Sequence, residues 1–194
     1  MGPARFKLPE SKRKAVYLHL LLRVTEYVTG RGMKMDREAM DSNCRRVARW
    51  LTNARAKPSL ILSGRPGTGK TTLLKALSDT LEQFHVARKM YVATDLQTAM
   101  IETPETFRDT VLHGSWADYL LLDDIGEEPV TVKDYGRDLP LFTKIVAERY
   151  ERMLPIILTT NLSFSDISTT YGVRTFDRLH EVADELTFNG VSYR

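Results

Sequence analysis

Apolar residues recur at helical spacing in the first part of the chain. Residues 11–28 place them on one face of a predicted helix, and a pair of glycines then breaks the pattern. Asp36 is suited to cap a second helix that runs to about residue 56, because a short carboxylate can accept hydrogen bonds from the first helical turn. Pro58 ends this helix. The pattern therefore predicts a helical N-terminal arm over residues 1–57.

After Pro58 the pattern changes to short, uninterrupted apolar runs, which are typical of strands buried on both faces of a parallel sheet. The runs are residues 60–62, 90–93, 119–122 and 156–158, and a last strand-like segment, 186–193, contains the hairpin signal Asn189-Gly190. Helices are predicted between them, over 70–84, 95–112 and 138–153, and two short helices are predicted within 163–183. These elements predict an α/β fold of three layers with a mostly parallel five-stranded sheet, formed by residues 58–194.

Charge is unevenly distributed between these two parts. The chain has a net charge of +3, but residues 1–57 hold 14 Lys and Arg against five acidic residues, so they carry +9 and the remainder carries −6. A basic arm favours an acidic partner, either nucleic acid or a protein surface. A solvated helical face is the alternative explanation.

The remaining composition excludes several classes of protein. Cys44 is the single cysteine, so an internal disulfide is impossible, and the four histidines lie far apart without metal-binding spacing. The apolar run 18–22 is too short to cross a membrane, and no signal-peptide cleavage pattern follows it. The sequence therefore predicts a soluble, cytoplasmic protein without membrane contact.

A glycine-rich segment follows the first predicted strand and opens the next helix. Backbone amides at such a helix start can bind phosphate oxygens, the lysine can reach the β- and γ-phosphates, and the following threonine can ligate Mg²⁺. Strand before and helix after are the context that this motif requires. We therefore predict an ATP site formed by Gly64, Arg65, Pro66, Gly67, Thr68, Gly69, Lys70, Thr71 and Thr72.

Polar residues follow two later strands, at the sheet edge where ligands bind in such folds. Asp123 is predicted to hold Mg²⁺ opposite Thr71, and Asp124 to polarise the attacking water as general base. Asn161 is suited to contact the γ-phosphate or to orient that water, although alone it could cap the next helix. Arg178 is a candidate arginine finger for a neighbouring subunit, and a surface ion pair is its more ordinary explanation.

These segments together resemble the AAA+ ATPases, above all the bacterial helicase loaders of the DnaC and DnaI type and the related IstB transposition helpers. The resemblance covers roughly residues 58–194 and rests on the segments GRPGTGKTT, LLLDDIG, ILTTNLS, YGVRTFDRL and FNGVSYR. It implies a Walker A motif (the P-loop) at residues 64–71 and a Walker B motif at Asp123-Asp124. It also implies sensor 1 at Asn161 and a trans-acting arginine finger at Arg178. It also implies an ATP-dependent homo-oligomer that acts with DNA and a replicative helicase.

Several departures keep other functions open. Asp124 stands where most AAA+ enzymes have Glu, so hydrolysis is expected to be slow without a partner. The chain ends at Arg194, so no helical lid domain is predicted, and Arg174 or Arg194 is left to supply its charge. The alternatives are an IstB-like helper that binds double-stranded DNA and a transposase, and a nucleotide-binding scaffold without turnover. A nucleoside kinase fits the pattern poorly. The polar loop 127–136 is expected to contact a neighbouring subunit.

Overall fold

Five parallel strands form the centre of the computed structural model, which describes residues 7–32, 36–114, 119–134 and 137–189. The strand order is β2-β3-β6-β1-β7. The strands are β1 (Ser59–Gly64), β2 (Arg88–Val92), β3 (Tyr119–Ile125), β6 (Ile156–Thr160) and β7 (Ala183–Phe188). Strands β1, β3 and β6 are buried almost throughout, as their uninterrupted apolar runs predict.

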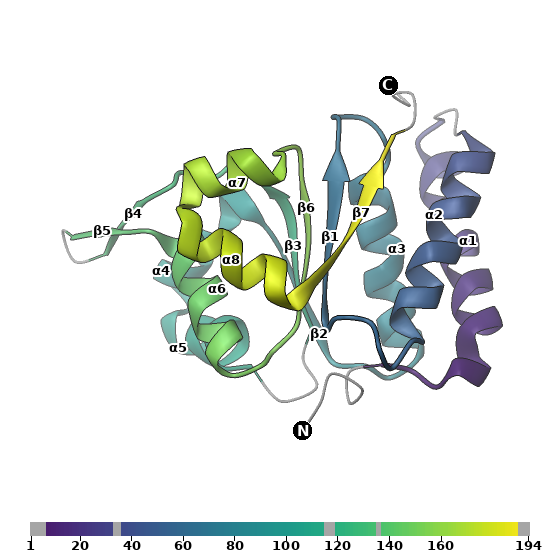
Figure 1. Cartoon of the computed structure of the whole chain (residues 1–194), viewed down its shortest axis with the longest axis horizontal. Helices are drawn as coiled ribbons and strands as arrows, with labels where there is room; N and C mark the ends of the chain where they lie inside the picture. The colour runs from purple at the N-terminus through teal and green to yellow at the C-terminus, as the bar shows by residue number, and fades with distance from the viewer. Residues whose placement is uncertain (1–6, 33–35, 115–118, 135–136, 190–194) are drawn as a thin grey trace.

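Helices cover both faces of the sheet, so the molecule has three layers (Figure 1). One side carries α1 (Arg13–Gly30), α2 (Arg37–Leu51) and α3 (Lys70–Gln83). The other side carries α4 (Leu96–Glu102), α5 (Pro104–Phe107), α6 (Leu141–Glu151), α7 (Phe164–Tyr171) and α8 (Val173–Val182). Within β1, Leu60 and Leu62 enter one hydrophobic core and Ile61 enters the other. The predicted three-layer α/β fold is confirmed.

The N-terminal helices are part of this layered structure. Val16, Leu20 and Val24 on α1 are fully buried and share a core with α3 and the sheet. Polar contacts support the same packing, because Arg23 Nε donates to Asp79 Oδ2 on α3 at 2.8 Å. Asp36 caps α2 as expected, accepting from the Ala39 amide at 3.0 Å. The two helices therefore form an outer layer over α3 and one edge of the sheet.

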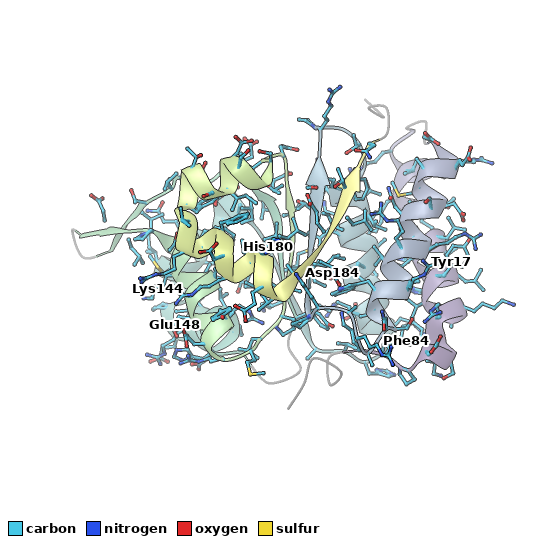
Figure 2. All side chains as sticks on the ribbon, viewed as in Figure 1. Tyr17, Phe84, Lys144, Glu148, His180 and Asp184 are labelled. Atoms are coloured by element: carbon cyan, nitrogen blue, oxygen red, sulfur yellow. The ribbon has the colours of Figure 1, made fainter. Side chains whose placement is uncertain are left out.

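Tyr17 on α1 and Glu148 on α6 lie at opposite ends of the molecule (Figure 2). Among the described helices none is long and apolar enough to cross a membrane.

Three segments differ from the pattern-based expectation. The predicted helix 95–112 is divided into a short 3₁₀ turn (Ala93–Asp95), α4, α5 and a π-helical stretch (Arg108–Leu112), because Thr103 adopts a non-helical conformation before Pro104. The polar segment after β3 is not wholly a loop but contains a two-stranded hairpin, β4 (Val132–Asp134) and β5 (Arg137–Leu139). This hairpin extends from the body of the molecule (Figure 1).

The C-terminal segment pairs differently from a local hairpin. Strand β7 lies parallel to β1, with Phe188 opposite Gly64. The second arm of the predicted hairpin, residues 190–194, lies outside the described residues.

Candidate nucleotide-binding site

Glycines shape the loop between β1 and α3. At Gly64 (φ 140°) a Cβ atom would lie 2.5 Å from the Phe188 carbonyl oxygen, so the loop can leave the sheet beside β7 only without a side chain. Gly69 (φ 91°) immediately precedes α3, and none of the described side chains caps that helix. The first-turn amides of α3 therefore remain available for an anion, favoured by the positive end of the helix dipole.

Lys70 is the first residue of α3 and is only 5% exposed. Its Nζ donates to the carbonyl oxygens of Gly64 at 2.6 Å and Arg65 at 2.8 Å, and to Asn161 Oδ1 at 2.8 Å. Asn161 follows the end of β6, the strand beside β1. The structure thus brings together two predicted site residues that are 91 positions apart.

Thr71 meets the acidic end of β3. Its Oγ1 donates to Asp123 Oδ1 at 3.0 Å, and Thr159 Oγ1 on β6 donates to the same oxygen at 2.7 Å. Asp123 is 3% exposed, whereas Asp124 lies at an irregularity near the end of β3 and has a φ of 59°. The Asp124 amide donates to Thr159 Oγ1 at 2.8 Å, which fixes the backbone there. Because β1, β3 and β6 are neighbours and run parallel, the hydroxyl and carboxylate oxygens meet at the carboxyl ends of these strands.

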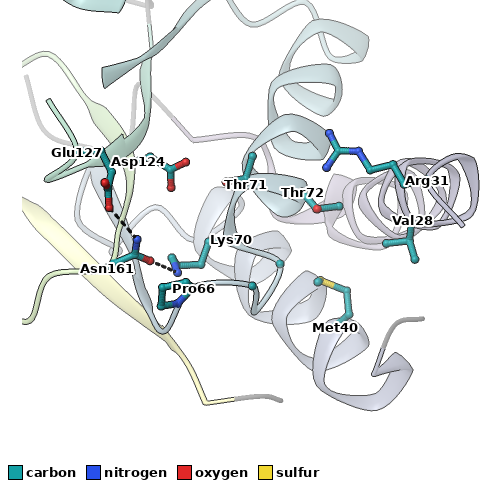
Figure 3. A pocket seen from close by; sticks show the side chains of 12 residues that line it. Val28, Arg31, Met40, Pro66, Lys70, Thr71, Thr72, Asp124, Glu127 and Asn161 are labelled. Atoms are coloured by element: carbon teal, nitrogen blue, oxygen red, sulfur yellow. Dashed lines mark hydrogen bonds between the residues drawn. The ribbon is translucent and has the colours of Figure 1, made fainter. Parts of the chain in front are cut away.

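A cavity of about 480 Å³ opens over these groups (Figure 3). Eight predicted site residues line it, namely Pro66, Gly67, Gly69, Lys70, Thr71, Thr72, Asp124 and Asn161. The other predicted residues of this region, Gly64, Arg65, Thr68 and Asp123, stand outside that lining. Thr68 braces the loop, because its Oγ1 donates to the Arg65 carbonyl at 2.8 Å. Asp123 does not line the cavity itself but accepts a hydrogen bond from Thr71, which does.

Four further residues line the same cavity, and the motif analysis did not assign them to it. Val28 and Arg31 come from the end of α1, Met40 from the start of α2, and Glu127 from the turn after β3. The apolar spacing of Val28 and Met40 predicts burial but not the surface against which they pack. Glu127 is only three residues after Asp124, and this short separation could have indicated that both side chains line the same cavity.

Arg178 lies on α8, outside this cavity. It is paired with Glu151 of α6 at 3.2 Å, and its guanidinium carbon lies 5.4 Å from the centre of the Tyr150 ring. Within one copy of the chain Arg178 therefore makes a surface ion pair. Arg174, on the same helix, is exposed.

The oxygen groups at this edge fit Mg²⁺. This ion is usually held by one or two carboxylates together with substrate phosphates and water. Asp123 Oδ1 and Thr71 Oγ1, 3.0 Å apart and next to the start of α3, form a donor set of this kind. Such binding does not require a cluster of several protein ligands. In the described part of the chain no group of three or more His, Cys, Asp or Glu could hold a metal ion.

A parallel sheet in the order β2-β3-β6-β1-β7, with a P-loop after β1 and acidic residues at the end of β3, defines a P-loop protein of the AAA+ type. The chain belongs to the family of IstB-like ATP binding proteins, whose family model matches residues 33–194.

Known proteins of the same type resemble the chain over most of its length. The replicative helicase loader DnaC of Escherichia coli K12 is 30% identical over 142 residues, which are 70% of this chain and 56% of that protein. The chain thus matches about half the length of this curated relative. The crystal structure of the DnaC helicase loader has a TM-score of 0.53 at 27% identity, covering 68% of this chain and 78% of that one. The crystal structure of DnaI has a TM-score of 0.57, 23% identity and coverages of 72% and 74%, and this likeness concerns the fold alone.

Proposed function

We propose that the chain is an ATPase of the helicase-loader type, which assembles with ATP and acts with DNA on a replicative helicase. The observation that carries the proposal is that four side chains meet at the N-terminus of α3, namely those of Lys70, Thr71, Asp123 and Asn161. A lysine, a hydroxyl–carboxylate pair and an amide are the groups that phosphoryl transfer requires for positioning and charge stabilisation. Membership in an ATP-binding family and the likeness to DnaC support the same assignment.

The proposed roles follow from the positions of the groups. The P-loop amides and Lys70 hold the β- and γ-phosphates, which means that Nζ exchanges its contacts with the Gly64 and Arg65 carbonyls for phosphate oxygens. Thr71 and Asp123 hold Mg²⁺, which when bound neutralises charge on the phosphates. Asp124 lines the cavity and polarises the attacking water, and Asn161 positions that water or the γ-phosphate.

Arg178 supports a site completed by a second copy of the chain. It lies outside the cavity of its own chain, and its pairing with Glu151, itself 64% exposed, is a surface contact that a neighbour could replace at modest cost. We propose that Arg178 approaches the γ-phosphate held by an adjacent subunit, where positive charge stabilises the transition state. Turnover would then depend on assembly.

A basic groove of about 640 Å³ supports the proposed contact with DNA. It is lined by Lys7, Arg13, Arg49 and Arg55 with one acidic residue, Glu10, which pairs with Arg13 at 2.9 Å. Among the described residues neither Arg49 nor Arg55 forms an ion pair. The groove lies near the start of β1, because Lys7 Nζ donates to the Lys57 carbonyl at 2.8 Å, whereas the nucleotide cavity lies beyond the end of that strand. The two sites are therefore at opposite ends of β1. DNA and ATP can therefore bind at the same time.

An IstB-like transposition helper is the second candidate, and the family model that spans residues 33–194 favours it. The ATP site would be the same, but the partners would be double-stranded DNA and a transposase. Capture experiments with the purified chain, a replicative helicase and a transposase, each with and without a non-hydrolysable ATP analogue, separate the two. ATP-dependent capture of the transposase alone would reject the loader.

The ATP site is tested by Lys70→Ala. Loss of the ammonium group removes the main side-chain contact to the phosphates, so ATP affinity should fall at least about 100-fold. Lys75→Ala, on the same helix but outside the cavity, is the matched control and should bind ATP normally. Titration with a fluorescent ATP analogue measures both. Unchanged affinity in Lys70→Ala would reject the P-loop site, and tight binding without any turnover in the unaltered chain would favour a nucleotide-binding scaffold.

A further inference from the structure

Glu127 is a second acidic side chain in the nucleotide cavity. It lies in the turn after β3, directly after Gly126, whose φ of 110° and tight approach to Leu162 admit no side chain. Figure 3 shows Glu127 and Asp124 on the same wall of the cavity, facing the side on which Lys70 lies. Both carboxylates thus border the space in front of the P-loop.

Glu127 is joined to the P-loop lysine by hydrogen bonds. Asn161 Nδ2 donates to Glu127 Oε1 at 3.5 Å, and Asn161 Oδ1 accepts from Lys70 Nζ at 2.8 Å (Figure 3). The amide therefore lies between the ammonium group that binds the phosphates and the Glu127 carboxylate. A group that positions the γ-phosphate or its attacking water is thereby in direct contact with Glu127.

The neighbouring Glu128 has a different position. Its Oε2 accepts from the Gly126 amide at 2.8 Å and its Oε1 from the Tyr171 hydroxyl at 2.5 Å, so it points toward the end of α7. Glu128 is not among the residues that line the cavity. Its contacts hold the turn in the shape that leaves Glu127 facing Asn161.

Asp124 alone is a short base. An aspartate side chain is one methylene shorter than a glutamate side chain, and the Asp124 backbone is fixed by its hydrogen bond to Thr159. Glu127 has the longer side chain and is more than a third exposed, so it can move toward the γ-phosphate when Lys70 turns to the phosphates.

We propose that Glu127 accepts the proton of the attacking water, with Asp124 orienting that water, an inference that rests on the proposed ATPase function. The water oxygen bonds to the γ-phosphorus, and the bond from that phosphorus to the β–γ bridging oxygen breaks. ADP leaves with the bonding electron pair, and the water proton passes to a Glu127 oxygen and then to solvent. No further reactant is needed.

The test compares steady-state ATP hydrolysis by Glu127→Gln and by Glu105→Gln, an exposed glutamate on α5 that serves as control for loss of a charge. We expect kcat to fall roughly 100-fold in E127Q without a rise in KM, because the base acts in the transition state. Adding Asp124→Glu to E127Q should restore part of kcat, because a longer carboxylate then reaches the water. Turnover of E127Q within about 2-fold of the unaltered chain would overturn the proposal.

A binding measurement separates this proposal from the proposed ATPase function. A carboxylate near the γ-phosphate repels it, so E127Q should bind ATP several-fold more tightly relative to ADP, whether or not the chain turns over. Absent turnover in the unaltered chain, with DNA and at high protein concentration, counts against the ATPase. An unchanged ratio of ATP to ADP affinity in E127Q counts against the position of Glu127.

Discussion

Asp123 joins three elements through a single carboxylate oxygen. Oδ1 accepts from Thr71 on α3 and Thr159 on β6, and only 3% of the residue is exposed. Asp123→Asn keeps the shape of the side chain but removes the charge that a hard cation prefers. We expect ATP affinity to fall at least about 10-fold in the presence of Mg²⁺ and to change little in EDTA. Nucleotide titrations under both conditions measure this.

The matched control for this substitution is Asp95→Asn, an exposed aspartate outside the cavity. It should leave the Mg²⁺ enhancement of ATP affinity unchanged. If Mg²⁺ increased ATP affinity equally in Asp123→Asn and in the unaltered chain, Asp123 would not be a ligand of the metal.

The site could be predicted from sequence where a polar residue stands near the carboxyl end of a buried strand. Lys70, Asp123 and Asn161 meet because parallel strands end at one edge, and their spacing along the chain is enough to predict this. Their chemical roles stay predictions. Arg31 lines the cavity because the end of α1 packs beside the P-loop, and no local pattern encodes such a long-range contact. The Glu127 position depends on the turn geometry at Gly126, which the sequence alone does not reveal.

At the scale of elements, hydrophobic pattern predicted the strands well and the packing of α1 poorly. Strands buried on both faces have a distinctive run of apolar residues, so their positions were fixed within a few residues. An apolar helical stripe, in contrast, shows only that one face is buried. The partner of α1 is α3, and this follows from the three-dimensional arrangement of residues 61 positions apart, such as His19 and Thr80.

Two leucines on α1 test how much that helix stabilises the molecule. Leu20 is fully buried, whereas Leu22 is 54% exposed two positions later. Leu20→Ala should lower the free energy of unfolding by about 2–5 kcal/mol through lost burial and the cavity left behind, and Leu22→Ala by less than about 0.5 kcal/mol. Urea unfolding measures both. Equal small effects would mean that α1 is an appendage, and a large effect implies that deletion of the basic segment unfolds the chain.

At the scale of the assembly, Arg178 and Asp124 give a complementation test. Arg178→Ala should bind ATP nearly as well as the unaltered chain, since it lies outside the cavity, but should lose stimulated turnover. Asp124→Asn should also be inactive. Mixing the two variants creates interfaces with an intact Asp124 on one side and an intact Arg178 on the other, so part of the activity should return. No recovery at any mixing ratio would contradict a shared site.

The basic groove gives a test that leaves the fold intact. Arg49 and Arg55 are exposed, so Arg49→Gln with Arg55→Gln removes charge without disturbing the core. If each arginine neutralises one phosphate, the slope of log affinity against log salt should decrease by roughly 1.5–2, and DNA affinity should fall at low salt. The control is Lys89→Gln with Lys144→Gln, two lysines that do not line the groove. Lys144, on α6, lies far from α1 (Figure 2). This pair removes equal charge and should leave that slope unchanged.

Lys7 should make the proposed binding of DNA depend on pH. Burial lowers the pKa of its amino group from 10.5 to about 7, against the opposing attraction of Asp184. A polyanion in the groove favours the charged amine and raises that pKa, so binding takes up a proton. Affinity for DNA should therefore rise as pH falls from about 9 to 7 and level off below the pKa of the free chain. Titrations at constant ionic strength measure this, and Lys7→Met should flatten the profile. A profile equally steep in Lys7→Met would place the titrating group elsewhere.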